Sequence, residues 1–251
     1  IETVGVDDEG LMPSKIPAGA DIVFATPSHH CPTTVTMPLA RRASLLKRAA
    51  KDNFIVVEDD YEFEMSFLHP PSPALKSLDQ EGRVVHIGSF SKSLFPGLRL
   101  GYLVGSAPFI REARALRATV LRHPPGHVQR TAAYFMSLGH YDALIKRTAR
   151  AFAARRQVMA EAFKANDLTI AGGGSGGASF WMRAPTGVDT KGLAKALEKE
   201  GVLIEPGAAF FPEANPPQDY YRLAYSSIPE TRIGEGIARI ARAIKAQEAR
   251  P

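Results

Sequence analysis

Short apolar runs that alternate with helical patterns constrain the fold of this chain more than any other feature. Residues 22–26, 54–57 and 84–89 each predict a buried strand. Amphipathic helical patterns follow at 38–49 and 108–122. This alternation predicts an α/β fold with a mostly parallel sheet covered by helices. In such sheets ligands bind at the carboxyl ends of the strands.

The pattern changes in the C-terminal part of the chain. A long helix is predicted over residues 141–166, and a Gly-rich link at 172–177 follows it. Further strands are expected at 168–171, 179–182, 202–204 and 222–226, and further helices at 190–200 and from 229. The chain therefore predicts two domains: a large domain over residues 1–145, and a long interdomain helix with a smaller α+β domain over residues 146–251.

Composition excludes several classes of protein. The chain has 251 residues, is 45% hydrophobic and 23% charged, and carries a net charge of +5. No apolar run reaches membrane-spanning length, so no membrane association is expected. The basic residues spread along helices and indicate solvated faces rather than a nucleic-acid groove. One cysteine, Cys31, fits a reducing cytoplasm.

One lysine stands among small hydroxyl residues directly after a predicted strand. Lys92 lies between Ser91 and Ser93, Ser89 precedes it, and Arg99 follows seven residues later. A lysine at the end of a buried strand is costly unless it is paired or reacts. Serines and an arginine beside it suggest a phosphate. An amine next to a phosphate is what a Schiff-base cofactor such as pyridoxal 5'-phosphate (PLP) needs. The alternative is a solvated loop lysine.

Three more side chains fit this chemistry. Asp59 ends a neighbouring strand, where a carboxylate could keep a pyridine nitrogen protonated. Tyr61 could donate to a phenolate oxygen. Arg222 lies in an apolar strand of the second domain and could offer a bidentate fork to a substrate carboxylate. Each residue also has an ordinary structural explanation. Asp59 could be an acid in a turn at the end of a strand, Tyr61 could simply pack, and Arg222 could form an ion pair at the surface.

Four segments together resemble the fold-type I, aspartate-aminotransferase-like PLP enzymes. The closer resemblance is to the aminotransferase-like domain of the MocR subfamily of GntR-type bacterial transcription regulators. The segments occur in family order over nearly the whole chain and comprise residues 26–38, 57–64, 89–102 and 221–227.

The resemblance implies a role for each matching residue. Lys92 is the Schiff-base lysine, and Asp59 is the partner of the pyridine nitrogen. Tyr61 contacts the phenolate oxygen. Arg222 takes the ligand carboxylate. The phosphate is held by a further group of residues, namely Ser89, Ser91 and Arg99.

The chain departs from the family pattern at two places. Aminotransferases of this class usually carry Asn-Pro-Thr/Ser-Gly where this chain has Cys31-Pro32-Thr33-Thr34. Cysteine is a weak donor, which argues against efficient transamination and fits the regulators. A segment of the large domain that precedes this start in family members is absent, so the chain resembles the C-terminal portion of a longer protein. Residues 1–7 are then expected to be the third strand of that domain. No metal site is expected, although histidines precede Cys31, because no second ligand cluster completes a tetrahedral site.

Three functions remain open at this point. The leading hypothesis is a cytoplasmic effector-sensing domain that binds an amino-group ligand as an external aldimine of PLP. Closure of the domain would then alter a DNA-binding domain that this chain lacks. The second hypothesis is a working aminotransferase in which Lys92 is the base. The third is a structural relic that dimerises without PLP. The resemblance also implies a homodimer and an amino-acid-like effector or substrate.

Overall fold

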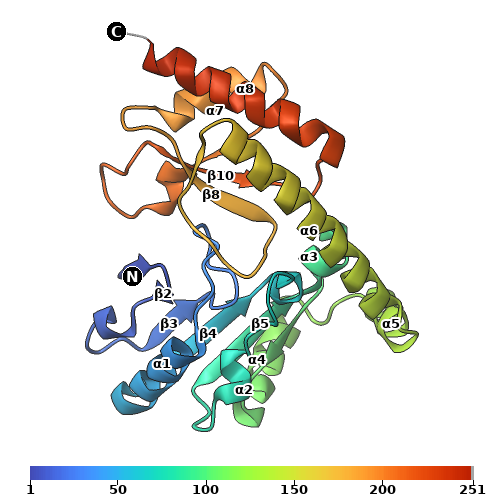
Figure 1. Cartoon of the computed structure of the whole chain (residues 1–251). Helices are drawn as coiled ribbons and strands as arrows, with labels where there is room; N and C mark the ends of the chain where they lie inside the picture. The colour runs from blue at the N-terminus through green and yellow to red at the C-terminus, as the bar shows by residue number, and fades with distance from the viewer. Residues whose placement is uncertain (250–251) are drawn as a thin grey trace. The chain divides into compact units, whose positions relative to one another are not determined.

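The computed structural model describes residues 1–249. By its internal contacts the chain divides into two units, one of Ile1–His30 with Val35–Ala149 and one of Cys31–Thr34 with Arg150–Pro251. Each unit contains its own four-stranded sheet (Figure 1).

The sheet of the first unit has the strand order β3-β4-β5-β6. Its strands are β3 (Ile22–Ala25), β4 (Ile55–Asp60), β5 (Val84–Ser89) and β6 (Gly101–Val104). The first three run parallel, and β6 runs antiparallel to β5. The predicted mostly parallel sheet is therefore confirmed. A parallel β6 would need a long crossover, whereas only short helices join it to β5.

Helices of the first unit connect these strands. They are α1 (Leu39–Asp52), α2 (Leu75–Leu78), α3 (Phe90–Ser93), α4 (Ala107–Val120) and α5 (Gly126–Ser137), with short 3-10 helices η1 (Pro13–Lys15), η2 (Phe63–Met65) and η3 (Pro96–Leu98). The apolar side of α1 packs on β3 and β4, where Leu45, Ala49 and Val56 are fully buried in one core cluster. This packing covers one face of the sheet and holds β4 in place.

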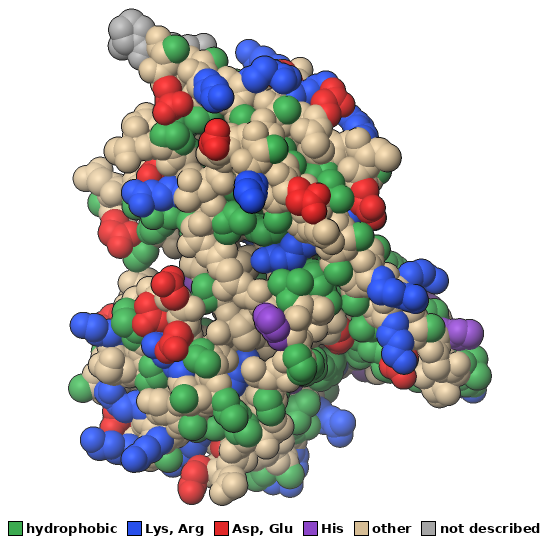
Figure 2. Space-filling model, in the orientation of Figure 1, with side chains coloured by type: hydrophobic (Ala, Val, Ile, Leu, Met, Phe, Trp, Pro, Cys, Tyr) green, Lys and Arg blue, Asp and Glu red, His purple; other side chains and the backbone are tan. Residues whose placement is uncertain are grey.

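Side chains of β4 alternate between the two faces of the sheet. Glu58 and Asp60 are buried on the covered face, whereas Asp59 is half-buried on the other. On the Asp59 face, Phe24 of β3 is 70% exposed and Leu103 of β6 is 47% exposed. Figure 2 shows many hydrophobic side chains at the surface of this unit. Asp59 therefore lies on the more open face.

The N-terminal residues do not form the predicted strand of the main sheet. Instead, β1 (Val6–Asp7) pairs antiparallel with β2 (Gly10–Leu11) in a separate two-stranded sheet. Gly10 has φ +89°, which favours a tight local turn. Arg41 of α1 binds Asp7 of β1 and Glu9 of the turn, both at 2.6 Å. The prediction of a large-domain strand over residues 1–7 is wrong because the chain closes locally into this hairpin.

The second unit is built on an antiparallel sheet with the strand order β7-β8-β10-β9. Its strands are β7 (Thr169–Ile170), β8 (Ser179–Arg183), β9 (Glu205–Pro206) and β10 (Tyr220–Ala224). The helices are α7 (Thr190–Glu198), α8 (Glu230–Glu248) and the 3-10 helix η4 (Gly207–Phe210). The long helix α6 (His140–Ala165) begins in the first unit and enters the second at Arg150.

The core of the second unit explains why β8 reads as a continuous apolar run. Four of its five residues are buried, and Phe180 makes an edge-to-face contact with Phe163 of α6 at 5.0 Å. Helices α7 and α8 add fully buried leucines and isoleucines, namely Leu193, Leu197, Ile233, Ile237 and Ile240. Burial of both faces of β8 fixes β10, its neighbour, in register.

The strand predicted at residues 202–204 is displaced. The structure places β9 at Glu205–Pro206, and Leu203 is 76% exposed. The N–H of Val202 instead donates to the carbonyl of Leu197 at 3.0 Å. The apolar run therefore closes the end of α7 rather than joining the sheet.

Within residues 1–249, no helix is both long enough and apolar enough to cross a membrane.

Candidate functional site

The carboxyl ends of β4 and β5 meet at one edge of the sheet. The two strands are parallel neighbours, and Asp60 is in register with Gly88. Tyr61 and Ser89 therefore leave their strands at the same edge. The structure thus brings together the Asp59 and Lys92 segments, as the strand pattern predicts.

A one-turn helix presents Lys92 at this edge. Ser89 ends β5 and caps α3, because its Oγ accepts a hydrogen bond from the N–H of Ser91 at 3.2 Å. Lys92 lies in the last turn of α3 and is exposed. Its neighbour Ser93 is buried. The cap therefore fixes the turn that carries the amine.

Arg99 lies close in the chain to the helix that carries Lys92 and follows the 3-10 helix η3. It has φ +49°, and its side chain is exposed. The next residue, Leu100, accepts a hydrogen bond from the N–H of Phe90 at 3.0 Å, which ties this turn back to α3. Among residues 1–249, neither Lys92 nor Arg99 has an acidic partner. Two cations without a carboxylate partner suit an anionic ligand.

Asp59 lies on the open face of β4, whereas the other two acids of this strand, Glu58 and Asp60, are buried on the covered face. Burial raises the pKa of the Asp59 carboxyl, and the nearby charge of His86 opposes that rise. No described residue donates a side-chain hydrogen bond to Asp59. A half-buried carboxylate of this kind favours a cationic N–H donor as its partner.

Tyr61 follows β4 and is engaged with a neighbouring loop. Its hydroxyl donates to the backbone carbonyl of His29 at 3.1 Å. The hydroxyl of Ser28, one residue earlier, donates to Asp60 at 2.8 Å. These two bonds attach the end of β4 to the loop that leads to Cys31.

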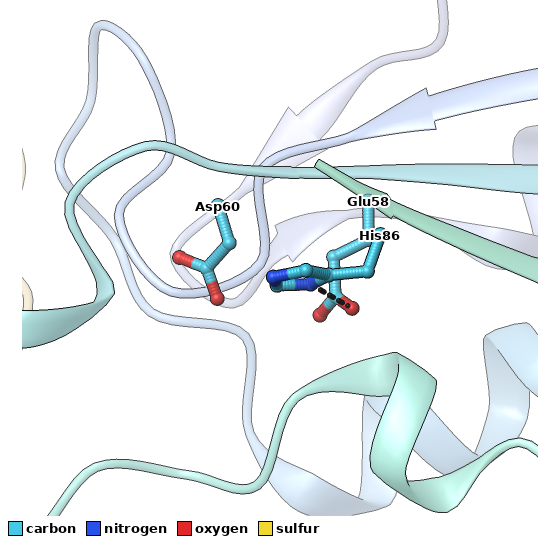
Figure 3. A group of neighbouring side chains, drawn as sticks. All are labelled: Glu58, Asp60 and His86. Atoms are coloured by element: carbon cyan, nitrogen blue, oxygen red, sulfur yellow. Dashed lines mark hydrogen bonds and ion pairs between the residues drawn. The ribbon is translucent and has the colours of Figure 1, made fainter. Parts of the chain in front are cut away.

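Behind this edge lies a buried polar group, drawn in Figure 3, that the sequence analysis did not anticipate. Glu58 accepts hydrogen bonds from the N–H groups of Leu75 and Lys76, at 2.6 and 3.0 Å. Nδ1 of His86 lies 2.9 Å from the same carboxylate. This hydrogen bond to Glu58 raises the pKa of His86. Burial raises the pKa of Asp60 to about 6.

A fully buried arginine completes this group. Arg42 of α1 donates to the carbonyls of Pro27, Met37 and Pro73 at 2.9 to 3.0 Å. Its charge lies close enough to lower the pKa of Asp60 against the effect of burial. Because the Glu58 oxygens already accept three donors, we interpret the cluster as a hydrogen-bonded charge network rather than a metal centre. The signal in the sequence is a charged residue inside each apolar run.

The predicted ligand arginine lies in the second unit and has partners there. Nη1 of Arg222 pairs with Glu205 of β9 at 2.9 Å, and Nε donates to Ser179 at 3.1 Å. Arg222 is in register with Trp181 of β8, whose ring stacks on Tyr220 at 5.5 Å. The sequence analysis missed Glu205 because the strand was expected at 202–204.

Comparison with known proteins assigns this fold to a family. Residues 3–240 match the family described as aminotransferase class I and II. The chain belongs to this family. The HTH-type transcriptional regulator TauR of Rhodobacter capsulatus is 62% identical over 244 residues, which cover 97% of this chain and 50% of TauR. The probable rhizopine catabolism regulatory protein MocR of Rhizobium meliloti is 30% identical over 90% of this chain and 46% of MocR.

Solved structures of aminotransferases share the fold. Kynurenine aminotransferase of Pyrococcus horikoshii, solved in complex with PMP, superposes with a TM-score of 0.89 at 30% identity, over 99% of this chain and 64% of that enzyme. The aspartate-aminotransferase type of fold and the likeness to MocR-type regulators are thus confirmed. The chain spans about half the length of the curated regulators that it matches.

The segment where this aminotransferase-family chain departs from the usual motif is conformationally unusual. Cys31–Thr34 groups with the second unit, and the N–H of His30 donates to the carbonyl of Val35 at 2.9 Å across its base. Thr34 takes the left-handed conformation with φ +60°, although it is β-branched. Its hydroxyl is buried without a hydrogen-bond partner among the described residues. The usual motif has glycine here, the residue that adopts this conformation without strain.

Proposed function

We propose that this chain is a PLP-binding, effector-sensing domain of a bacterial transcription regulator. The observation that carries the proposal is the edge of the first sheet. It combines the exposed amine of Lys92 with Arg99, a second cation without an acidic partner. Asp59, a half-buried carboxylate without a side-chain donor, lies at the same edge.

The residues at this edge suit PLP. Arg99, Ser89 and Ser91 would hold its phosphate, and Asp59 would hold its pyridine nitrogen in the protonated form. Tyr61 would exchange its bond to the His29 carbonyl for one to the phenolate oxygen. When bound, PLP supplies an aldehyde that condenses reversibly with amines. Lys92 would be the resident amine.

The proposed ligand carries an amino group and an acid group. Its amine would take the place of Lys92 on the cofactor, and Arg222 would grip its acid group through a charged hydrogen-bonded fork. Ligand binding would favour one conformation of the two units over another. A DNA-binding domain elsewhere in the protein would respond to that shift. The 62% identity to an HTH-type regulator supports this reading.

Catalytic transamination is the second candidate function. The likeness to kynurenine aminotransferase supports it, and Lys92 would serve as the base once a ligand amine has replaced it. Cys31 argues against an efficient reaction, because a thiol is a weaker donor than the amide of the usual asparagine.

We also propose that the protein is a cytoplasmic homodimer. Helices α4 and α5 support a dimer because most of their large apolar residues are exposed to solvent in the single chain. These residues are Phe109, Leu116, Val120, Tyr134 and Met136. Exposed apolar area of this kind marks interaction surfaces.

The assignment of Lys92 is tested by absorbance. The full-length protein loaded with PLP is expected to show a band near the edge of the visible range, and a ligand amine is expected to shift it. Lys92→Ala should remove the band. The matched control is Lys195→Ala, which changes an exposed lysine on α7 and should leave the band intact. A band of wild-type strength in Lys92→Ala would show that the cofactor is carried elsewhere.

A further inference from the structure

The guanidinium of Arg222 forms an ion pair with Glu205, an acid on the neighbouring strand of the same sheet. Cross-strand register places Arg222 opposite Glu205, and the two side chains pair at 2.9 Å. Ser179 binds Nε at 3.1 Å and so fixes the plane of the guanidinium from the other side. The Glu205 side chain is 52% exposed, whereas that of Arg222 is 21% exposed. The acid is thus the solvent-facing member of the pair.

We propose that Glu205 is a specificity determinant that lets Arg222 bind singly charged acids and reject doubly charged ones. The proposal rests on the proposed role of Arg222 as the receptor of the ligand's acid group. The Glu205 carboxylate would lie beside the Arg222 guanidinium, which is the position where the acid group of the ligand must bind. We call this position the Arg222 seat.

Charge is the first reason. The pair of Arg222 and Glu205 has no net charge, so the seat attracts an anion only through the arginine fork, at short range. A ligand with one acid group can displace the exposed Glu205 from the guanidinium. A second acid group on the ligand would lie beside a carboxylate at a distance of a few ångströms, and such like-charge repulsion is strong near a protein surface.

Surroundings are the second reason. On the same face of the sheet, Trp181 lies in register with Arg222 and stacks on Tyr220, and Phe210 makes an edge contact with Trp181 at 5.8 Å. The rings carry no charge, and the cation beside them, Arg183 over the Tyr220 ring, is already paired with Asp219 at 2.9 Å. A ligand with one acid group and an apolar or neutral remainder therefore suits this wall.

The alternative is that Glu205 is an ordinary surface partner of Arg222. The second unit contains a suitable comparison, the pair of Arg239 and Glu235 on α8. That pair also joins an arginine to a largely exposed glutamate, but its side chains come from one helix. Glu235→Gln therefore makes the same chemical change as Glu205→Gln at a pair to which no ligand role is assigned.

The test uses tryptophan fluorescence, because Trp181 is the only tryptophan of the 251-residue chain and lies in register with Arg222. Propionate and succinate are titrated at constant ionic strength. Neither has an amino group, so neither reacts with PLP, and comparison with Arg222→Gln isolates the part of the response that depends on Arg222.

The wild-type chain is expected to bind propionate more tightly than succinate, and Arg222→Gln should bind neither. Glu205→Gln should raise the affinity for propionate by about two- to fivefold, the scale of an exposed ion pair. Its affinity for succinate should rise further, by about tenfold, because a like-charge repulsion is also removed. Glu235→Gln should match wild type with both probes.

The experiment distinguishes failure of the specificity role of Glu205 from failure of the ligand-binding role of Arg222. If Glu205→Gln raises both affinities equally or matches Glu235→Gln, Glu205 has no role in specificity, while the Arg222 seat stands. If Arg222→Gln binds propionate as wild type does, or if wild type gives no saturable response, Arg222 is not the anion receptor. The proposed ligand role of Arg222 then fails together with this inference.

Discussion

Replacement of Thr34 by glycine is expected to stabilise the protein, which is unusual for the loss of a buried side chain. Thr34 is buried with φ +60°, a left-handed conformation that disfavours β-branched residues. Its hydroxyl also has no hydrogen-bond partner among the described residues. Glycine removes the steric conflict and the buried hydroxyl together.

The magnitude follows from four contributions. The left-handed conformation costs an L-residue about 1–2 kcal/mol, and a buried hydroxyl without a partner costs about 1–3 kcal/mol. Against these, glycine loosens the unfolded chain by about 0.4–1 kcal/mol. The two lost carbon atoms, Cβ and Cγ2, remove about 1.6 kcal/mol of burial. The free energy of unfolding should therefore rise in Thr34→Gly, by about 1 kcal/mol.

Thermal and urea denaturation of wild type, Thr34→Gly and Thr34→Ala measure this effect. Alanine removes the hydroxyl but keeps a Cβ in the left-handed conformation, so its gain should be smaller than that of glycine. For a chain of this size the midpoint temperature rises by about 2–4 °C per kcal/mol. A Thr34→Gly protein that is less stable than wild type would refute the reasoning. Equal gains for glycine and alanine would assign the whole effect to the hydroxyl.

Two further perturbations test other parts of the structure. Burial raises the pKa of Asp60 to about 6 from 3.8, so the folded state holds this proton more tightly than the unfolded state. The stability should then fall by up to about 3 kcal/mol between about pH 4 and pH 6. His86, whose pKa is raised by its hydrogen-bonded carboxylate, adds a loss in the same direction as the pH rises through its folded pKa. Denaturant titrations of wild type and Asp60→Asn from pH 4 to pH 8 should show the first loss in wild type alone, and parallel curves would contradict the assignment. In the second unit, a Cβ at Gly172 would lie 2.1 Å from the carbonyl oxygen of Thr33, so Gly172→Ala should lower the free energy of unfolding by about 1–3 kcal/mol. The control is Gly173→Ala, where a Cβ meets nothing within 4 Å, and equal losses at both positions would count against the predicted clash.

The fold of this chain was predictable wherever hydrophobic pattern and turn chemistry agree. The strands β4 and β5 end in polar residues next to continuous apolar runs, and that pattern alone predicts which edge carries Asp59 and Lys92. Prediction failed where local bonding competes with the pattern. Residues 202–204 are apolar, yet the backbone of Val202 closes a helix. Residues 6–11 form a local hairpin because Arg41 binds Asp7 of its first strand and Glu9 of its turn.

The place of the candidate site in the sheet was predictable, but the partners of its residues were not. The residue types at positions 59 and 92 indicate cofactor chemistry, and strand order places both at one edge. Pairings between distant segments leave no periodic signal. The network of Glu58 with His86, and the bond of Arg222 to Glu205, depend on strand register. Register is a property of the folded sheet, which the sequence specifies only through the whole core.

The central claim is that Lys92 is the amine that carries PLP. Borohydride reduction of the PLP-loaded protein fixes the cofactor on whichever amine holds it, and mass spectrometry of the peptides then locates it. The account predicts one pyridoxyl group, on the peptide that contains Lys92. Its absence from Asp59→Ala, at PLP concentrations that saturate wild type, would support the neighbouring carboxylate as well. A pyridoxyl group on a different lysine, or one spread over several surface lysines, would contradict the account.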